Sequence, residues 1–223
     1  MGKCLKWCAS ATRVACAKIR LGSRLRLPRG GKPVYLGRAA RLDVAPDGVM
    51  VLGSGVYIDD LCRLQVMPGA RMEVSGGCYF NTNCRVVATD SVYVGGHTMF
   101  GPNACVFDHD HIFDSEGVHG ELVSSPIEIG DCCWLGANVL VTKGVHIADR
   151  ICIGGGSAVT RGLEEPGIYV GAPARLVRRT FPEGGGVDGA PGTPQETQAR
   201  DGSPQAAQRA VAAPHLQGQG EGA

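Results

Sequence analysis

Two histidines stand one residue apart in the segment Asp108-His109-Asp110-His111. An imidazole titrates near neutral pH, so either ring could take a proton from a substrate as a general base. In an extended strand alternate side chains share a face, so the two histidines would point one way and the two aspartates the other. The same residues could instead form a polar rim at the base of a loop, or supply two imidazole ligands to a zinc site. The segment predicts chemistry at this point of the chain and leaves the type of site open.

The composition indicates a chain rich in turns. Among 223 residues there are 34 Gly and 13 Pro, and aromatic residues make up 5%, which argues against a helical bundle. The 22 Lys and Arg nearly balance the 21 Asp and Glu, so the chain lacks the domain-wide positive field of nucleic-acid-binding proteins. No apolar run approaches the roughly 18 residues of a membrane-spanning helix. We expect a soluble, mostly β protein with no nucleic-acid partner.

A six-residue repeat dominates the second half of the chain. Aliphatic residues recur there at an unbroken spacing of six: Ile129, Leu135, Val141, Ile147, Ile153 and Val159. Each hexapeptide is expected to be a short strand followed by a tight corner, and three of them would complete one triangular coil. Ile129 would then lie beneath Ile147, in coils about 4.8 Å apart. The period identifies an all-β fold, a hexapeptide-repeat parallel β-helix whose core is an aliphatic ladder.

The repeat continues upstream with less regularity. Val94, Phe100 and Val106 keep the period. Four earlier residues keep the spacing of six in a frame shifted by two: Val74, Phe80, Val86 and Val92. Residues 112–125 break the pattern with Asp, Glu and Gly, so we expect an excursion loop there, in a position where functional residues often lie.

The two ends of the chain differ from the repeat. The first 32 residues carry nine positive charges and no acid, and 1–33 is interpreted as a basic N-terminal arm. An amphipathic helix in this arm could make a peripheral contact with an anionic membrane, or it could pack on the first coil. Residues 180–223 have almost no large apolar side chains and are predicted to be a disordered tail. The β-helix domain with its C-terminal segment therefore spans 34–179.

The ten cysteines do not form a recognisable framework. No Cys-x-x-Cys pair occurs, and several cysteines fall where the repeat requires a small buried side chain. We interpret them as reduced packing residues, which predicts a cytoplasmic protein.

Three stretches of the repeat carry a familiar pattern. They are Pro126-Ile127-Glu128-Ile129-Gly130 with the following Trp134-Leu135-Gly136-Ala137-Asn138, the run from Gly154 to Arg161, and Gly171-Ala172-Pro173-Ala174-Arg175. These residues resemble the hexapeptide-repeat acetyltransferases, most closely the maltose, galactoside and capsule-sugar O-acetyltransferases, over residues 70–179. The resemblance implies a left-handed β-helix, a homotrimer with active sites between subunits, and acetyl-CoA as the acyl donor.

The resemblance also assigns the catalytic base. In the related enzymes the catalytic histidine lies eight residues after the position of Asn103, and that position is His111 here. His109 is the alternative. A zinc site in hexapeptide proteins is expected to use histidines at a wider spacing than His-x-His, so no metal is predicted.

The acceptor pocket is assigned less completely. Asn81 matches an asparagine that lines the pocket in the related enzymes, although asparagine also occurs at β-helix corners because it tolerates left-handed backbone. The acceptor aspartate of the galactoside enzymes falls on Thr89. Asp90 is the nearest substitute, but a shift of one residue in a strand reverses the direction that the side chain faces.

The donor groove is expected to have small residues along the pantetheine arm and cations near the phosphates, because a guanidinium group suits a phosphate. The resemblance assigns six residues to it, from the arm to the phosphates: Ala137, Gly155, Thr160, Arg161, Arg175 and Arg178.

The predicted function is the transfer of acetyl from acetyl-CoA to a hydroxyl of a sugar or polysaccharide precursor, by direct attack. Two alternatives stay open on the same scaffold. One is N-acetylation of an amino sugar or an antibiotic, and the other is a non-catalytic β-helix acting as a scaffold subunit.

Overall fold

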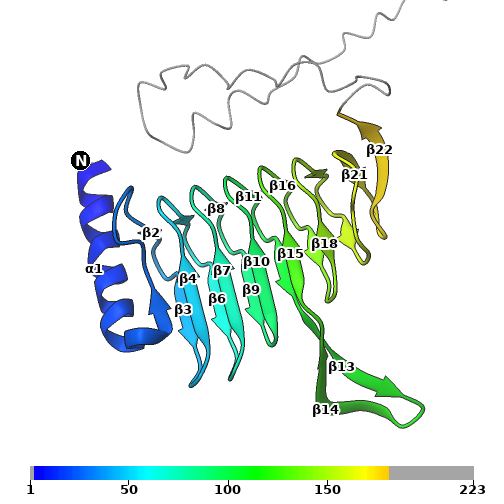
Figure 1. Ribbon diagram of the computed structural model, residues 1–223, viewed down its shortest axis with the longest axis horizontal. Coiled ribbons are helices and arrows are strands. Elements are labelled where there is room, and N and C mark those ends of the chain that lie inside the picture. The colour runs from blue at the N-terminus through cyan, green and yellow to red at the C-terminus, as the bar shows by residue number, and fades with distance from the viewer. Residues whose placement is uncertain (1–2, 181–223) are drawn as a thin grey trace, which may run out of the picture. The chain divides into compact units, whose positions relative to one another are not determined.

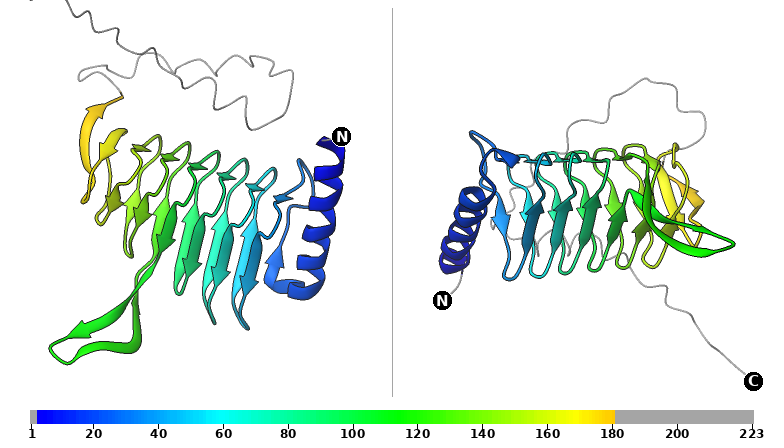
Figure 2. Two further views of the ribbon diagram at one scale, coloured as in Figure 1. Left: turned by 180° about the vertical axis from the view of Figure 1, so that it is seen from behind. Right: turned by 90° about the horizontal axis from the view of Figure 1, so that it is seen from below.

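The structure, a computed structural model, describes residues 3–180. The predicted tail therefore lies outside the described residues except for Thr180. The described chain winds as a left-handed parallel β-helix, as predicted, and each coil gives one strand to each of three sheets (Figures 1 and 2). One helix lies at the N-terminal end of the stack, and a hairpin projects from its side.

The three sheets run along the stack of coils, and their neighbouring strands are parallel except for the last pair of sheet B. Sheet A contains β1 (Leu25–Arg26), β4 (Val49–Leu52), β7 (Arg71–Val74), β10 (Ser91–Val94), β15 (Ile127–Ile129) and β18 (His146–Ile147). Sheet B contains β2 (Tyr35–Leu36), β5 (Tyr57–Ile58), β8 (Tyr79–Phe80), β11 (Met99–Phe100), β16 (Trp134–Leu135), β19 (Cys152–Ile153), β21 (Gly167–Val170) and β22 (Arg175–Arg179). Sheet C contains β3 (Arg41–Val44), β6 (Arg63–Val66), β9 (Arg85–Ala88), β12 (Cys105–Phe107), β17 (Leu140–Val141) and β20 (Ala158–Val159).

The aliphatic ladder predicted from the repeat is the core. Ile129 pairs with Ile147 in sheet A. The strands on the other two sides of the triangle pair in the same way, Leu135 with Ile153 in sheet B and Val141 with Val159 in sheet C. All six aliphatic residues of the second-half repeat have no exposed surface. Phe80 and Phe100 stack within the same interior, with ring centroids 4.4 Å apart. Each coil buries its apolar residues against its two neighbours, so the core exists only in the stack.

The frame shift in the first half arises from longer strands. In sheet C, β6 has four residues with two buried, Leu64 and Val66, whereas β17 has two residues with one buried. Two added residues preserve the alternation between inside and outside because side chains alternate with a period of two. The spacing of six is therefore displaced by two without any loss of core contacts.

The N-terminal arm contains α1 (Lys3–Leu21) followed by a 3-10 turn, η1 (Gly22–Arg24). The helix packs on the first coil, which is the second of the two sequence-based interpretations. Trp7 lies against Tyr35 with ring centroids 5.1 Å apart. The parallel coils begin at Leu25, where β1 pairs with β4, so they start within the segment 1–33 that the sequence assigns to the arm.

The basic residues of this arm bind the open end of the β-helix. Strands β2 and β3 are edge strands of their sheets. Arg13 Nε donates to the carbonyl of Leu36 at 2.8 Å, and Arg20 Nη2 donates to the carbonyl of Leu42 at 2.8 Å. Arg24 does the same for Val44 at 2.7 Å. The arginines thus satisfy carbonyl groups that have no neighbouring coil, and the helix covers an edge that would otherwise be open to pairing.

The expected excursion loop is a β-hairpin. Strands β13 (His109–Asp114) and β14 (Gly117–Ser124) pair antiparallel and project from the corner between sheets C and A (Figure 1). The predicted excursion is present, and its residues form a two-stranded ladder on either side of a turn at Ser115 and Glu116. The hairpin closes where Ser125 N donates to the carbonyl of Asp108 at 2.8 Å.

Eight of the ten cysteines fall into a buried and an exposed group, and Cys105 and Cys152 are half-buried. Cys62, Cys78, Cys84 and Cys133 are buried between coils, as the packing interpretation predicts. Burial raises the pKa of the Cys78 thiol to about 11, so that side chain is uncharged at neutral pH. The prediction was wrong for four others, which are exposed: Cys4, Cys8, Cys16 and Cys132.

Within residues 3–180, no helix combines the length and apolar character needed to cross a membrane.

Candidate active site

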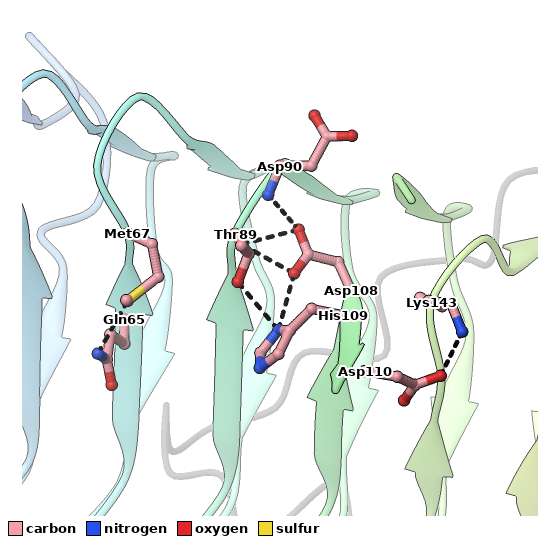
Figure 3. Close-up of polar contacts among 8 residues, drawn as sticks. All are labelled: Gln65, Met67, Thr89, Asp90, Asp108, His109, Asp110 and Lys143. Carbon is pink, nitrogen blue, oxygen red and sulfur yellow. Dashed lines mark hydrogen bonds and ion pairs between the residues drawn. The ribbon is translucent and has the colours of Figure 1, made fainter. Parts of the chain in front are cut away.

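A buried carboxylate organises the base of the hairpin. Asp108 has no exposed surface and follows the last residue of β12. Its carboxylate accepts the backbone N–H of Thr89 at 2.8 and 2.9 Å and that of Asp90 at 2.8 Å (Figure 3). A buried carboxylate is stable when backbone donors surround it, so Asp108 ties the end of one coil to the next.

His109 is the first residue of β13 and is half-buried beside Asp108. Its Nδ1 lies 3.0 Å from Thr89 Oγ1 and 3.2 Å from Asp108 Oδ1 (Figure 3). The ring is thus held from two neighbouring coils, with 19% of its side chain exposed. Such contacts fix the orientation of an imidazole and leave Nε2 for another partner.

His111 lies two residues further along β13 and is exposed. Its Nδ1 is 3.3 Å from the backbone carbonyl of His119 on β14. A carbonyl oxygen can only accept a hydrogen bond, so this contact places the proton on Nδ1 and leaves the lone pair on Nε2. His111 therefore has the tautomer that a general base acting through Nε2 requires.

The hairpin is held in shape by a second contact of His119. Its Nε2 lies 3.0 Å from Asp114 Oδ1, on the opposite strand. The contact with His119, together with the hydrogen bond from the backbone N–H of Glu116, lowers the pKa of the Asp114 carboxyl below its usual value. His119 thus contacts two parts of the hairpin. Its backbone carbonyl contacts His111, the candidate base, and its side chain contacts Asp114 beside the turn.

Asp110 faces away from His109 and forms an ion pair with Lys143, from the next coil (Figure 3). The ion pair binds the hairpin to the next coil, and the hydrogen bonds of the Asp108 carboxylate bind its base to the preceding coil. The two aspartates of the segment thus differ in their surroundings, since Asp108 is buried and Asp110 is exposed.

The acceptor candidates are placed apart from the histidines. Asn81 Oδ1 accepts the backbone N–H of the adjacent Thr82 at 2.8 Å, which is a local contact at a coil corner. Other asparagines take the left-handed corner conformation: Asn83, Asn103 and Asn138 have φ angles of 62°, 61° and 58°. The side chains of Asn83 and Asn103 are joined by a hydrogen bond of 2.9 Å. The carboxylate of Asp90 is exposed and points away from His109, as its neighbouring position in the chain implies (Figure 3).

The donor candidates lie at the C-terminal coils. Gly156 N donates to the carbonyl of Ala137 at 2.8 Å, so Ala137 and Gly155 occupy facing corners of adjacent coils. A Cβ on Gly155 would lie 3.0 Å from that carbonyl, so only glycine leaves this corner uncrowded.

The cationic candidates lie on two faces of the C-terminal coils, one formed by sheet C and the other by sheet B. Ala174 N donates to the carbonyl of Ala158 at 2.8 Å, which brings Arg175 beside β20 and the exposed Thr160 and Arg161 that follow it. Arg178 pairs in register with Ile168, on sheet B. Burial raises the pKa of the neighbouring Cys152 thiol, and the charge of Arg178 offsets only part of that rise.

Among the described residues, no three His, Cys, Asp or Glu side chains gather as they would around a metal ion.

Two contributors to the site were not assigned from the sequence. The hydroxyl of Thr89 contacts His109, although from the sequence Thr89 was noted only as the position where the galactoside enzymes have an aspartate. The carbonyl of His119 contacts His111, and this could not be found because the hairpin register was unknown.

The chain is similar in sequence to known acetyltransferases over part of its length. No protein-family profile matches the chain. The chain is 33% identical over 94 residues to galactoside O-acetyltransferase of Escherichia coli K12, covering 42% of this chain and 46% of the relative. It is 32% identical over 95 residues to galactoside O-acetyltransferase of Lactococcus lactis, with the same coverage. The chain thus spans about half the length of these curated relatives.

Solved structures share the fold. A variant of AntD, an N-acyltransferase from Bacillus cereus, in complex with dTDP-4-amino-4,6-dideoxyglucose and coenzyme A, aligns with a TM-score of 0.63 and 15% identity over 78% of this chain and 90% of AntD. The hexapeptide-repeat-containing acetyltransferase VCA0836 from Vibrio cholerae aligns with a TM-score of 0.53 and 21% identity over 78% of this chain and 82% of its own. The resemblance to hexapeptide-repeat acetyltransferases that the sequence indicates is confirmed.

Proposed function

We propose, from this resemblance and from the geometry at the hairpin, that the protein transfers an acetyl group from acetyl-CoA to a hydroxyl of a saccharide. His111 acts as the general base. The galactoside O-acetyltransferases that the chain resembles support the saccharide acceptor and the hydroxyl as the acetylated group. The coenzyme A bound by AntD supports the donor.

The observation that carries the proposal is the contact of His111 Nδ1 with the carbonyl of His119. With Nδ1 protonated, Nε2 takes the proton of the acceptor hydroxyl as its oxygen attacks the thioester carbonyl. The tetrahedral intermediate then collapses, its C–S bond breaks, and the imidazolium returns the proton to the thiolate of coenzyme A. Atoms and charges balance without a covalent acyl-enzyme.

His109 has a different role in this proposal. Its Nδ1 is held by Thr89 and by the buried Asp108, and its ring is less exposed than that of His111. These contacts fix the base of the hairpin and thereby the position of His111. His109 is a positioning residue, and it is the alternative base if His111 proves dispensable.

The donor binds along the C-terminal coils in this proposal. The corner of Ala137 and Gly155 leaves room for the pantetheine arm, with Thr160 beside it. Arg161 and Arg175, on the sheet C side, face the phosphates, where guanidinium groups form paired hydrogen bonds, and Arg178 approaches the phosphates from the sheet B side of the same coils. The hairpin projects from its own coils, which is consistent with a homotrimer whose sites lie between subunits.

The test measures thiol release from acetyl-CoA in the presence of galactosides and other neutral saccharides. His111→Ala is expected to lower turnover by about 10²–10⁴-fold, as for the loss of a general base, with acetyl-CoA affinity unchanged by calorimetry. His109→Ala, the matched control on the same strand, is expected to lower turnover less.

Near-normal turnover of the His111 variant would overturn the mechanism. A larger loss of turnover in the His109 variant than in the His111 variant would assign the general base to His109. Failure of the wild-type protein to bind acetyl-CoA would overturn the function itself.

A further inference from the structure

Three arginines form a column on the outward face of sheet C in the first coils. Arg41, Arg63 and Arg85 occupy the same position in β3, β6 and β9, and they pair in register from strand to strand. Neighbouring strands lie about 4.8 Å apart, so the column extends over about 10 Å. Arg41 and Arg85 are exposed, and Arg63 is half-buried.

Like charges directly opposite one another destabilise a sheet, and this column is poorly compensated. Arg63 Nε lies 2.9 Å from Asp43 Oδ2, and the same carboxylate is 3.7 Å from Arg20 of the helix. Within residues 3–180, Arg41 and Arg85 make no ion pair or side-chain hydrogen bond.

Sheet A shows the usual arrangement. Arg71, in the strand that follows β6 along the chain, lies 2.6 Å from Glu73 of its own strand. Positions where a sequence breaks a local rule without compensation within the fold are often functional. The arginine column is such a position.

The column shares its face with the candidate active site. Alternate residues of a strand face the same way, so Arg85 at the start of β9 faces the same side as Thr89 just beyond its end. Four residues of extended chain separate them by about 13 Å. Thr89 contacts His109, and Gln65 and Met67 of the neighbouring coil lie on this face beside it (Figure 3).

Arg85 also influences the strand that leads into the site. Burial raises the pKa of the thiol of Cys105, the in-register partner of Arg85 in β12, and the charge of Arg85 offsets only part of that rise. The residues that follow β12 are Asp108 and His109. The positive charge of the column therefore reaches the strand that positions the histidines.

We propose that Arg41, Arg63 and Arg85 form a subsite for a phosphate group of the acceptor, so that the preferred acceptor is a phosphorylated saccharide. This inference rests on the proposed acetyl transfer. A phosphate carries up to two negative charges and accepts paired hydrogen bonds from a guanidinium fork, so it neutralises the two uncompensated arginines better than one carboxylate would. The saccharide then extends along β9 toward the hairpin.

Binding is tested first, because it does not depend on catalysis. Inorganic pyrophosphate is titrated into the full chain by calorimetry at saturating coenzyme A, which occupies the donor phosphate site. Arg85→Gln is expected to weaken pyrophosphate binding by about tenfold or more, since a charged hydrogen bond is lost. Arg71→Gln, the matched control on sheet A, is expected to leave it unchanged.

Kinetics with two acceptors then tests the substrate class. A trisaccharide with a terminal galactose and a phosphate at its other end is long enough to span the roughly 13 Å between Arg85 and the hairpin, and it is compared with the same trisaccharide lacking the phosphate. Arg85→Gln is expected to raise KM for the phosphorylated acceptor alone, with kcat unchanged. An equal effect on both acceptors would overturn the subsite, as would unchanged pyrophosphate affinity. A changed sedimentation coefficient of the variant would assign the column to contacts between copies of the chain, which also overturns it.

The two proposals fail in different ways. Pyrophosphate binding that depends on Arg85, in a protein that acetylates neither acceptor, would leave the anion subsite and remove the acetyl transfer. Acetylation of the neutral and the phosphorylated trisaccharide with the same KM would do the reverse.

Discussion

The first and last coils of the β-helix have similar interiors and different exteriors. Both halves bury aliphatic residues, with Phe80 and Phe100 stacked between them. On the outside of sheet C, the strand position that holds Arg85 in β9 holds Cys105, Leu140 and Ala158 in the following coils. The change occurs at β12, from which the hairpin and its histidines emerge. The interior therefore determines that the coils stack, whereas the exterior differs from coil to coil and carries the residues of the proposed sites.

The two ends of the stack are also closed by different means. The C-terminal end is covered by an antiparallel strand, β22 on β21. At the N-terminal end, arginines of the helix donate to the carbonyls of β2 and β3. The basic character of the arm thus has a structural use that the sequence alone did not show.

The largest expected effect on stability tests whether the interior is uniform. Phe80→Ala removes one ring of the stack and should lower the free energy of unfolding by about 3–5 kcal/mol. Ile153→Ala, in the C-terminal coils, should cost about 2–5 kcal/mol. Chemical denaturation measures both, with the exposed Val177→Ala as a control that should change it by less than about 0.5 kcal/mol. A near-neutral effect at one of the two buried sites would show that the halves do not share one core.

A smaller effect is expected at the N-terminal cap. Arg24→Ala leaves the carbonyl of Val44 without its charged donor and should cost about 1–3 kcal/mol. The exposed Arg29→Ala is the control, since it removes an equal charge. Hydrogen exchange should show faster opening of β1 and β3 in the Arg24 variant and no change at β19. Equal effects of both variants would mean that the arm acts through its net charge and not through the carbonyl contacts.

The smallest effect concerns the hairpin and its pH dependence. The pKa of Asp114 is lowered in the folded protein, so its contact with His119 contributes fully above the unfolded pKa and is lost as the pH falls through the folded value. Nuclear magnetic resonance should show the hairpin amides ordered at pH 5 and loosened below about pH 4. Asp114→Asn should remove this transition and leave the coils unchanged. A hairpin whose acid transition persists in that variant would place the responsible group elsewhere.

Much of the candidate site followed from residue types in the chain. His109 and His111 were found as a pair because strand alternation is a local property, and the structure places them on one strand as expected. Asn81 was harder to interpret because asparagine serves both corners and pockets, and its side chain here caps its own corner. Thr89 could not be recognised, because its contact with His109 joins residues twenty positions apart.

The sequence by itself determined the coil, since the spacing of six reflects a local alternation of buried and exposed residues that each coil repeats. It also determined that residues 112–125 leave the coil. Only the tertiary structure decided that these residues form a hairpin with His111 against the carbonyl of His119. It alone aligned Arg41, Arg63 and Arg85 in one column. The hairpin contact and the arginine column both depend on the register between segments that are distant in the chain. That register follows from the number of residues in each strand and corner, and these lengths are settled only when whole coils pack on one another.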